Sequence, residues 1–353
     1  MSTFPVGYEI DKHRLIRKWK AEGLIAQNMW RTFEEVAEEY FSELLDRGII
    51  RPVTHGYNFS EVETCFYQVN HFMSQFLASL SAQQNFLTSW TLKSAVVAAA
   101  TAGRMEARMV QRLSLHQPDP ELQALLERTD FSHTRSLTVY GAVNQIPLDK
   151  FVHLVVLDLE GWENLKDDDM VQICSSQFFL LKYLSIRCTR VSWLPPQIIE
   201  LGYLETLDIS HTQIRELPSQ VWELLELQAL DLRNTQVKLL PGALRRLLVN
   251  DHQMDKIVTE VPKDIVNWRF LEALETVDLS NCSASFIENL ADLRFLEVLA
   301  VKWSFHQCYD EKCTSALQSA IHRSGCLKSL TIHCELGCSM EFLDSLADAS
   351  PVH

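Results

Sequence analysis

Leu181-Lys-Tyr-Leu-Ser-Ile-Arg-Cys-Thr-Arg-Val-Ser-Trp-Leu-Pro195, Leu204-Glu-Thr-Leu-Asp-Ile-Ser-His-Thr-Gln-Ile-Arg-Glu-Leu-Pro218 and Leu227-Gln-Ala-Leu-Asp-Leu-Arg-Asn-Thr-Gln-Val-Lys-Leu-Leu-Pro241 align with one another without a gap. They share the pattern L-x-x-L-x-L-x-x-T-x-[VI]-x-x-L-P, and equivalent leucines such as Leu184, Leu207 and Leu230 recur every 23 residues. A fixed period of this length indicates stacked copies of one short structural unit.

The pattern is that of a leucine-rich repeat, with Thr in the position that Asn or Cys fills more often. Each copy predicts one short strand, and weaker copies extend the array in both directions. The sequence therefore predicts an α/β fold, a leucine-rich-repeat solenoid (horseshoe) of about ten repeats over residues 110–353. The weaker copies are Leu113-x-Leu115, Leu137-x-Val139, Leu154-x-x-Leu157-x-Leu159, Leu244-x-x-Leu247-x-Val249, Leu274-x-x-Val277-x-Leu279, Leu296-x-x-Leu299-x-Val301 and Leu327-x-x-Leu330-x-Ile332.

The residues between the repeated leucines point away from the core, because side chains alternate along a strand. We expect them to form the concave face of the horseshoe, either as a partner-binding surface or as an ordinary solvated face. Trp303, just past one predicted strand, places a large apolar group near this face. The predicted partner-binding residues are Asp158, Glu160, Tyr183, Arg187, Asp208, Asp231, Arg233, Asp278, Lys302 and Trp303.

The N-terminal part of the chain predicts a winged-helix domain over residues 1–95, followed by a linker over 96–109. Its expected elements are an amphipathic helix over 11–24, a second helix with an apolar stripe over 32–45 and a further apolar helix over 72–80. A small hairpin is expected from the extended segments 49–53 and 64–69. A capping box at Thr32 to Glu35 begins the second helix. Basic residues run from Lys12 to Lys20, and the second helix is acidic from Glu34 to Asp46, which opposes insertion into a DNA groove. We interpret the two charge runs as solvated faces or as a docking surface for an adjoining domain.

Composition and charge exclude some classes of partner and location. The 353 residues include 32 basic and 46 acidic side chains, a net charge of -14 that repels a phosphate backbone. Ala95 to Ala102 is too short to span a membrane, and no secretory signal precedes the first helix. Nine cysteines, an odd number, favour free thiols. We expect a cytoplasmic protein with no nucleic-acid partner and no membrane span.

Two segments carry a resemblance to a known family. Leu15-Ile-Arg-Lys-Trp-Lys-Ala-Glu-Gly-Leu-Ile25 and Glu34-Glu-Val-Ala-Glu-Glu-Tyr-Phe-Ser-Glu-Leu-Leu-Asp-Arg-Gly-Ile-Ile-Arg-Pro-Val53 resemble the winged helix of plant NLR immune receptors, the coiled-coil NB-ARC leucine-rich-repeat disease resistance proteins. The order of winged helix, linker and repeats also matches. The resemblance implies a role in plant innate immunity by protein binding. The implied partners are a pathogen effector, a guarded host protein or an intact NLR.

The same resemblance implies that the sequence is a truncated receptor. Family members carry a coiled coil, a P-loop domain and a helical subdomain before the winged helix, whereas here no Gly is followed by Lys, so the P-loop motif is absent. We therefore expect no ADP or ATP cofactor. Val69, Asn70 and His71 stand where the family has its Met/Val-His-Asp motif. In the family such changes imply loss of the ADP-locked off state, and here, without a P-loop, drift is the preferred interpretation.

Other chemistry has weaker support. Cys308, Cys313, Cys326, Cys334 and Cys338 lack the paired C-x-x-C spacing of a zinc site, so free structural cysteines are preferred. The run Asp167-Asp-Asp169 favours an exposed loop over a metal cluster. No G-x-S-x-G motif is present, and no enzyme is expected. A repeat adaptor unrelated to nucleotide switching, an autonomous nucleotide switch and a non-functional receptor gene fragment are the alternative interpretations.

Overall fold

The computed structural model divides the chain into two compact units, Met1–Thr189 with Glu200–Thr206, and Arg190–Ile199 with Leu207–His353. The structure describes residues 3–25, 31, 33–53, 66–83, 88–90, 110–116, 126–127, 129–237, 246–248, 265, 268, 270–280, 282–334 and 341–343.

The first unit begins with the predicted winged helix. Its helices are α1 (Lys12–Glu22), α2 (Phe33–Asp46) and α3 (His71–Gln83), and its strands are β1 (Ile10–Asp11), β2 (Ile50–Pro52) and β3 (Phe66–Val69). The strands form an antiparallel sheet in the order β1-β3-β2. The three predicted helices and the hairpin strands are thus confirmed, whereas Thr32 and the predicted hairpin turn lie outside the described residues.

Local sequence signals set the ends of α1. The Asp11 carboxylate accepts a hydrogen bond from the backbone N–H of Arg14 at 2.9 Å and caps the start of the helix. Gly23 ends it with a φ of 68°, a left-handed conformation that glycine adopts without strain. One side of α1 places Leu15 in the winged-helix core, where the rings of Phe41 and Tyr67 meet edge to face at 4.6 Å.

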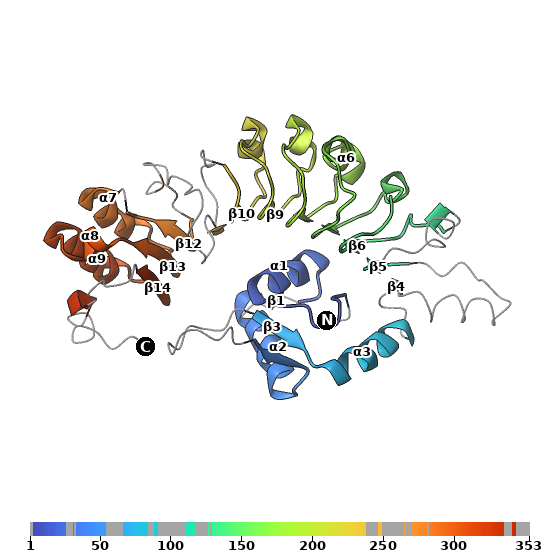
Figure 1. Ribbon diagram of the computed structural model, residues 1–353, viewed down its shortest axis with the longest axis horizontal. Helices are drawn as coiled ribbons and strands as arrows, with labels where there is room; N and C mark the ends of the chain where they lie inside the picture. The colour runs from blue at the N-terminus through green and yellow to red at the C-terminus, as the bar shows by residue number, and fades with distance from the viewer. Residues whose placement is uncertain are drawn as a thin grey trace. The chain divides into compact units, whose positions relative to one another are not determined.

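A parallel sheet follows in the first unit. Its strands pair in chain order: β4 (Thr88–Trp90), β5 (Arg112–Leu115), β6 (Ser136–Val139), β7 (Val156–Asp158) and β8 (Tyr183–Ser185). The connections contain η1 (Leu148–Lys150), α6 (Asp167–Ile173) and η2 (Ser176–Phe178). In Figure 1, α6 lies on one side of these strands and α1 on the other.

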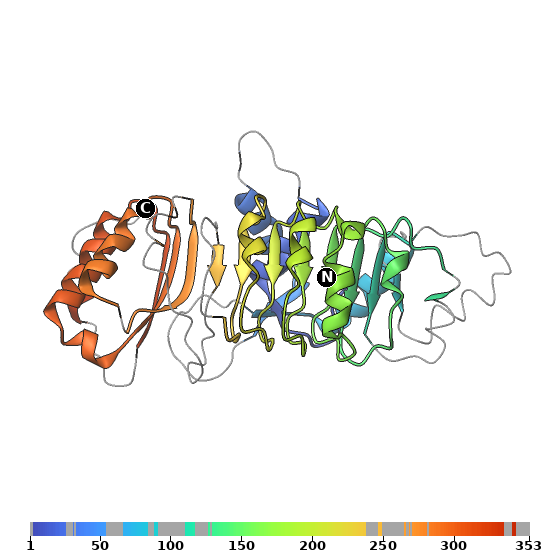
Figure 2. The same ribbon diagram turned by 90° about the horizontal axis from the view of Figure 1, so that it is seen from above.

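The second unit continues the pattern with β10 (Ala229–Asp231), β11 (Arg246–Leu248), β12 (Ala273–Asp278), β13 (Val298–Trp303) and β14 (Ser329–Cys334), again parallel in chain order. Its helical connections run beside the strands (Figure 2). They are η4 (Ser219–Glu223), α7 (Ala284–Asn289), η6 (Leu290–Asp292), α8 (Phe305–Cys308), α9 (Glu311–Arg323) and η7 (Glu341–Leu343). Two further elements, η3 (Pro196–Glu200) and β9 (Thr206–Asp208), contain residues of both units.

All ten predicted repeat strands are present as β5 to β14. Strand β4 was not predicted, and it begins at Thr88 inside the range expected to be winged helix. The predicted linker over 96–109 lies outside the described residues. The parallel sheet of the first unit therefore begins before the expected repeat boundary at residue 110.

The Thr that replaces Asn in the repeat pattern has a clear structural role. In Thr189, Thr212 and Thr235 the side-chain hydroxyl donates to the backbone carbonyl three residues earlier, at 2.7 Å in each case. All three threonines are buried, so these bonds satisfy carbonyls that water cannot reach. A hydroxyl at this position closes the turn after each strand.

Candidate functional site

The candidate site is the contact between helix α1 and strands β6, β7 and β8 of the same unit. Arg14 and Lys18 are one helical turn apart, so they project from one side of α1, while Leu15 faces the winged-helix core. The polar residues of the strands face α1 because they alternate with the buried leucines. The local sequence thus gives a basic helix surface opposite an acidic strand surface.

Arg14 is the centre of this contact. Its Nη2 lies 2.6 Å from Asp158 Oδ1, and its Nη1 forms an ion pair with Glu160. The Nε–H donates to the Tyr183 hydroxyl at 3.1 Å, and Nη1 also donates to the Tyr8 hydroxyl at 2.7 Å. Arg14 therefore joins two carboxylates from the β7 region, one phenol from β8 and one from the segment before α1.

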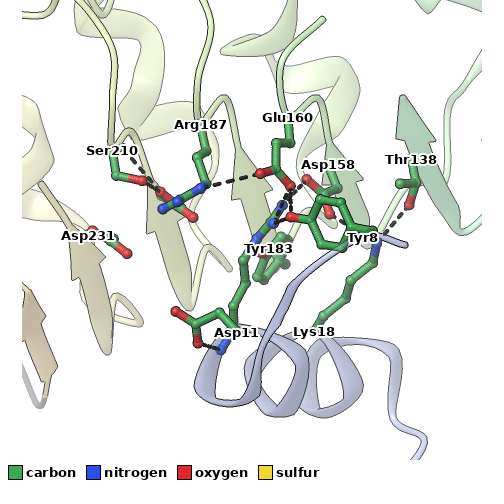
Figure 3. Close-up of polar contacts among 12 residues, drawn as sticks. Tyr8, Asp11, Lys18, Thr138, Asp158, Glu160, Tyr183, Arg187, Ser210 and Asp231 are labelled. Atoms are coloured by element: carbon green, nitrogen blue, oxygen red, sulfur yellow. Dashed lines mark hydrogen bonds and ion pairs between the residues drawn. The ribbon is translucent and has the colours of Figure 1, made fainter. Parts of the chain in front are cut away.

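Asp158 also binds Lys18. Lys18 Nζ lies 3.0 Å from Asp158 Oδ2 and donates to Thr138 Oγ1 at 2.7 Å (Figure 3). Each carboxylate oxygen of Asp158 thus takes one cation, because Arg14 occupies Oδ1. Both cationic side chains and the carboxylate are almost fully buried, with side-chain exposures of 6%, 4% and 0%.

Glu160 extends the network along the strands. Its carboxylate accepts a hydrogen bond from the Tyr8 hydroxyl and lies 3.3 Å from Arg187 Nε (Figure 3). At the other end of α1, Glu22 lies 2.6 Å from Arg112 Nε and accepts a hydrogen bond from Ser136 Oγ at 3.0 Å. The charged contacts therefore continue from the first turn of α1 to its last.

The electrostatics follow from burial and charge pairing. Burial raises the pKa of Asp158, but the charges and hydrogen bonds of Arg14 and Lys18 outweigh it, so the pKa lies below its usual range. Burial lowers the pKa of Arg14, and the opposing charges of Asp158 and Glu160 raise it above its usual value. Burial also raises the pKa of the Tyr8 hydroxyl, which therefore stays protonated. These groups form a charged contact with no reactive nucleophile.

The expectation that Asp158, Glu160 and Tyr183 form an open partner-binding face is wrong for this structure. Asp158 and Tyr183 are 0% exposed and Glu160 is 9% exposed, because α1 and Tyr8 contact them. Arg187 is partly exposed and pairs with Glu160. The structure therefore brings Asp158, Glu160, Tyr183 and Arg187 together. They form one side of an internal contact whose other side is α1 with Tyr8.

The predicted residues Asp208, Asp231 and Arg233 are also buried rather than solvated. Asp208 accepts hydrogen bonds from the backbone N–H and the hydroxyl of Ser210, the latter at 2.6 Å. Arg233 Nη2 lies 2.6 Å from Asp231 Oδ2. Asp208 and Asp231 thus each accept hydrogen bonds from the residue two positions later in the chain.

At β12 and β13, Lys302 Nζ lies 3.7 Å from Asp278 Oδ2, and both residues belong to the polar strand face. Trp303 does not, which corrects the prediction. Strand β13 continues to residue 303, so Trp303 has the same alternation as the buried Leu299 and Val301 and is 0% exposed. Its indole is part of the core.

The expected docking surface on the two charged helices is largely occupied within the first unit. Lys12 Nζ lies 2.7 Å from Glu38 of α2, and Arg14 and Lys18 bind Asp158. Sequence reasoning identified the two charged surfaces separately but missed that they bind each other, and it missed Tyr8 and Glu22. The feature of the sequence that could have predicted this contact is the opposite charge of the helix and the strands.

The degenerate family motif has a structural role in capping a helix. Asn70 Oδ1 accepts a hydrogen bond from the backbone N–H of Phe72 at 3.1 Å, at the start of α3. The Asn70 N–H donates to the carbonyl of Ile49 at 2.8 Å, which ties α3 to the hairpin. Val69 ends β3, and His71 is exposed.

The acidic run at 167–169 also has a structural role. The aspartates at 167–169 begin helix α6 rather than an exposed loop, and the Asp169 carboxylate accepts from the Lys166 N–H at 2.9 Å. Negative charge at a helix N-terminus is stabilising. Among the described residues no group of three His, Cys, Asp or Glu side chains is placed to hold a metal ion. Cys338 lies outside them.

Comparison with known proteins supports the fold and the family resemblance. Residues 133–247 and 214–351 match the family described as a leucine-rich repeat region. Residues 3–76 match the family described as the disease resistance protein winged helix domain. In the part of the chain that is described, no helix has the length and apolar character needed to cross a membrane.

Three curated relatives come from Oryza sativa subsp. japonica. Disease resistance protein Pik-2 is 39% identical over 210 residues, which are 59% of this chain and 19% of Pik-2. Disease resistance protein Pik-1 is 36% identical over 209 residues, 58% of this chain and 17% of Pik-1. Disease resistance protein RGA4 is 34% identical over 207 residues, 58% of this chain and 19% of RGA4. The chain spans about a fifth of the length of these relatives.

Proposed function

Since this chain belongs to the leucine-rich-repeat family, we propose that it acts in plant defence by binding other proteins. In this proposal, helix α1 and the partner protein compete for the same face of the repeats. Relatives named as disease resistance proteins, and the winged-helix match at residues 3–76, support the defence role. The Arg14 network supports the competition, because α1 already occupies the polar face of β7 and β8.

The physical basis is exclusion. Asp158 and Tyr183 are fully buried beneath α1, so another protein reaches them only after α1 has moved away. A partner that binds the uncovered face then shifts the equilibrium toward the open arrangement, and α1 in turn weakens partner binding. The proposed partners are a pathogen protein, a host protein that such a pathogen protein modifies, or an intact relative of this chain.

We further propose that the protein acts in the cytoplasm, by binding and without catalysis or a nucleotide cofactor. Leucine-rich-repeat and winged-helix domains are typically not catalytic, and the buried ion pairs around Arg14 contain no activated nucleophile. A fluorescent fusion of the full chain in leaf cells tests the location.

The experiment that tests the competition uses charge reversal on α1. Tagged wild-type chain and the double variant Arg14→Glu with Lys18→Glu are expressed in leaf cells, and co-purifying proteins are identified. The control is Arg47→Glu, because the Arg47–Glu43 pair is on the exposed surface. Hydrogen exchange of α1 amides, measured on the purified proteins, reports whether the double variant has released the helix.

We expect the double variant to release α1 and to recover more of its partner than either the wild type or the control. Recovery should be lost again when Asp158→Lys is added, because that change reverses the uncovered face. Released α1 with unchanged partner recovery would show that α1 and the partner do not compete. Partner recovery that survives Asp158→Lys would place the binding surface elsewhere.

A further inference from the structure

The side of helix α1 that contacts the strands carries its charges in a fixed order. Arg14, Lys18 and Glu22 are four residues apart, so they lie along one side of the helix. The strands carry the opposite charges in the same order, because Asp158 of β7 binds Arg14 and Lys18, and Arg112 of β5 pairs with Glu22. Helix and strands therefore match in the order of their charges as well as in sign.

The contacts at Asp158 restrict what can take the place of α1. Arg14 Nη2 lies 2.6 Å from Oδ1, and Lys18 Nζ lies 3.0 Å from Oδ2 (Figure 3). Arg14 Nε–H also donates to the Tyr183 hydroxyl, and Lys18 to Thr138 Oγ1. A segment that covers the same atoms without cations would bury the Asp158 carboxylate unpaired, which is strongly unfavourable. Acidic and uncharged segments are therefore poor replacements for α1.

The spacing of these charges suits a helix. Residues four positions apart are separated by about 6 Å along a helix axis but by about 13 Å along a strand. Arg14 and Lys18 must reach the two oxygens of one carboxylate, so the shorter separation is required. Their distance from Glu22 then sets where the acidic residue meets Arg112. An extended segment with the same spacing would not reach all these atoms.

We propose that the partner protein presents a helix with basic residues at positions i and i+4 and an acidic residue at i+8, and that this helix takes the place of α1 on the strands. The inference rests on the competition proposed above and names the chemistry of the partner. The two cations bind Asp158, and the acidic residue binds Arg112. The apolar residues of the partner helix are free to differ, because Leu15 of α1 packs in the winged-helix core.

The probe that tests this proposal is α1 itself, supplied as a separate peptide. It has the sequence of residues 11–23, so it keeps both helix caps, and it is acetylated, amidated and labelled with fluorescein. Leu15→Ala and Ile16→Ala in the peptide remove apolar groups that belong to the winged-helix core, and alanine favours the helix. Fluorescence anisotropy measures its binding to the full chain.

Three forms of the full chain are compared, and two control peptides match the net charge of the probe. The proteins are the wild type, Arg14→Glu with Lys18→Glu, and that double variant with Asp158→Lys added. One control peptide carries Lys18→Glu with Glu22→Lys, which changes the charge order in either direction of binding. The other carries Ile16→Pro in place of Ile16→Ala, which disrupts the helix without changing its charges.

We expect the probe to bind the double variant about tenfold or more tightly than the wild type, because the tethered α1 occupies the face in the wild type. Adding Asp158→Lys should abolish binding, and both control peptides should bind about tenfold or more weakly than the probe. Failure of the probe to bind the double variant, or binding that survives Asp158→Lys, would overturn the proposal. Equal binding of either control peptide would overturn the charge order or the helical form, respectively.

Lys18→Met provides a second variant, since it removes one of the two cations that bind Asp158. It should fold, as thermal melting will show, and bind the probe more tightly than the wild type does. If the double variant does not melt cooperatively, equal affinity of Lys18→Met and the wild type overturns the proposal.

The partner itself is tested by displacement. Excess probe should displace the partner that the double variant recovers from leaf cells, whereas the peptide with Lys18→Glu and Glu22→Lys should not. If recovery follows the competition but the probe neither binds nor displaces the partner, the competition stands and the basic helix alone is refuted. If release of α1 leaves recovery unchanged, the competition itself is refuted, and binding of the probe then reports only how the chain recognises its own helix.

Discussion

Replacing Asp158 with Asn tests the energetic role of the α1 contact most directly. The substitution keeps the shape of the side chain and removes the one charge that is shared by Arg14 and Lys18, at 2.6 Å and 3.0 Å. Two charge-assisted hydrogen bonds contribute about 1.5 to 3 kcal/mol each. Loss of one partner from a buried ion pair costs about 3 to 5 kcal/mol. We therefore expect Asp158→Asn to lower the free energy of unfolding by about 3 to 5 kcal/mol.

The assay is urea unfolding of the full chain, combined with hydrogen exchange of α1 amides to locate the change. Glu43→Gln is the control, because its pair with Arg47 is exposed and should contribute about 1 kcal/mol or less. Arg14→Met combined with Asp158→Asn gives the coupling energy of the pair. If Asp158→Asn is as stable as the control, or if α1 exchange is unchanged, the contact does not hold the helix and the reasoning is refuted.

Three further predictions concern pH, packing and ligand binding. Burial lowers the pKa of His116 to about 4, from about 6.5 in the unfolded chain, so the unfolded chain takes up the proton first as pH falls. The free energy of unfolding should therefore decrease between about pH 6.5 and pH 4, and His116→Gln should flatten this decrease in urea titrations at each pH. Trp303→Ala should destabilise the protein by about 3 to 5 kcal/mol, and a value near that of Lys302→Ala would mean that the indole does not support the core. Calorimetric titration with ADP should release no binding heat, because the sequence lacks G-x-x-x-x-G-K-[ST], and a Kd below about 100 μM would contradict this expectation.

Much of the fold could be predicted because its signals are local. The spacing of leucines within about six residues marks each strand, and ten strands were located in this way. Strand β4 carries Thr-Ser-Trp and no such spacing, so it gave no signal. Trp303 was placed on the wrong face because β13 runs to residue 303, beyond the last repeated apolar position.

The candidate site was less predictable because its contacts are distant in sequence. Arg14 and Asp158 are 144 positions apart, and alternation alone says which face Asp158 occupies but not what covers it. Periodicity therefore identified both surfaces and left their pairing open. The run at 167–169 shows the same limit, since its charges suit a helix start as well as a loop.

The two-oxygen arrangement at Asp158 has a consequence for related chains. Arg14 takes one oxygen and Lys18 the other, so the carboxylate sets both the rotation of the helix about its axis and its position along that axis. A homologous chain with a different charge order on either surface would not fit its counterpart here. In hybrids made from two relatives, the N-terminal helix and the repeats it contacts should therefore come from the same parent. Functional recombinants should be those in which the helix and these repeats were exchanged together.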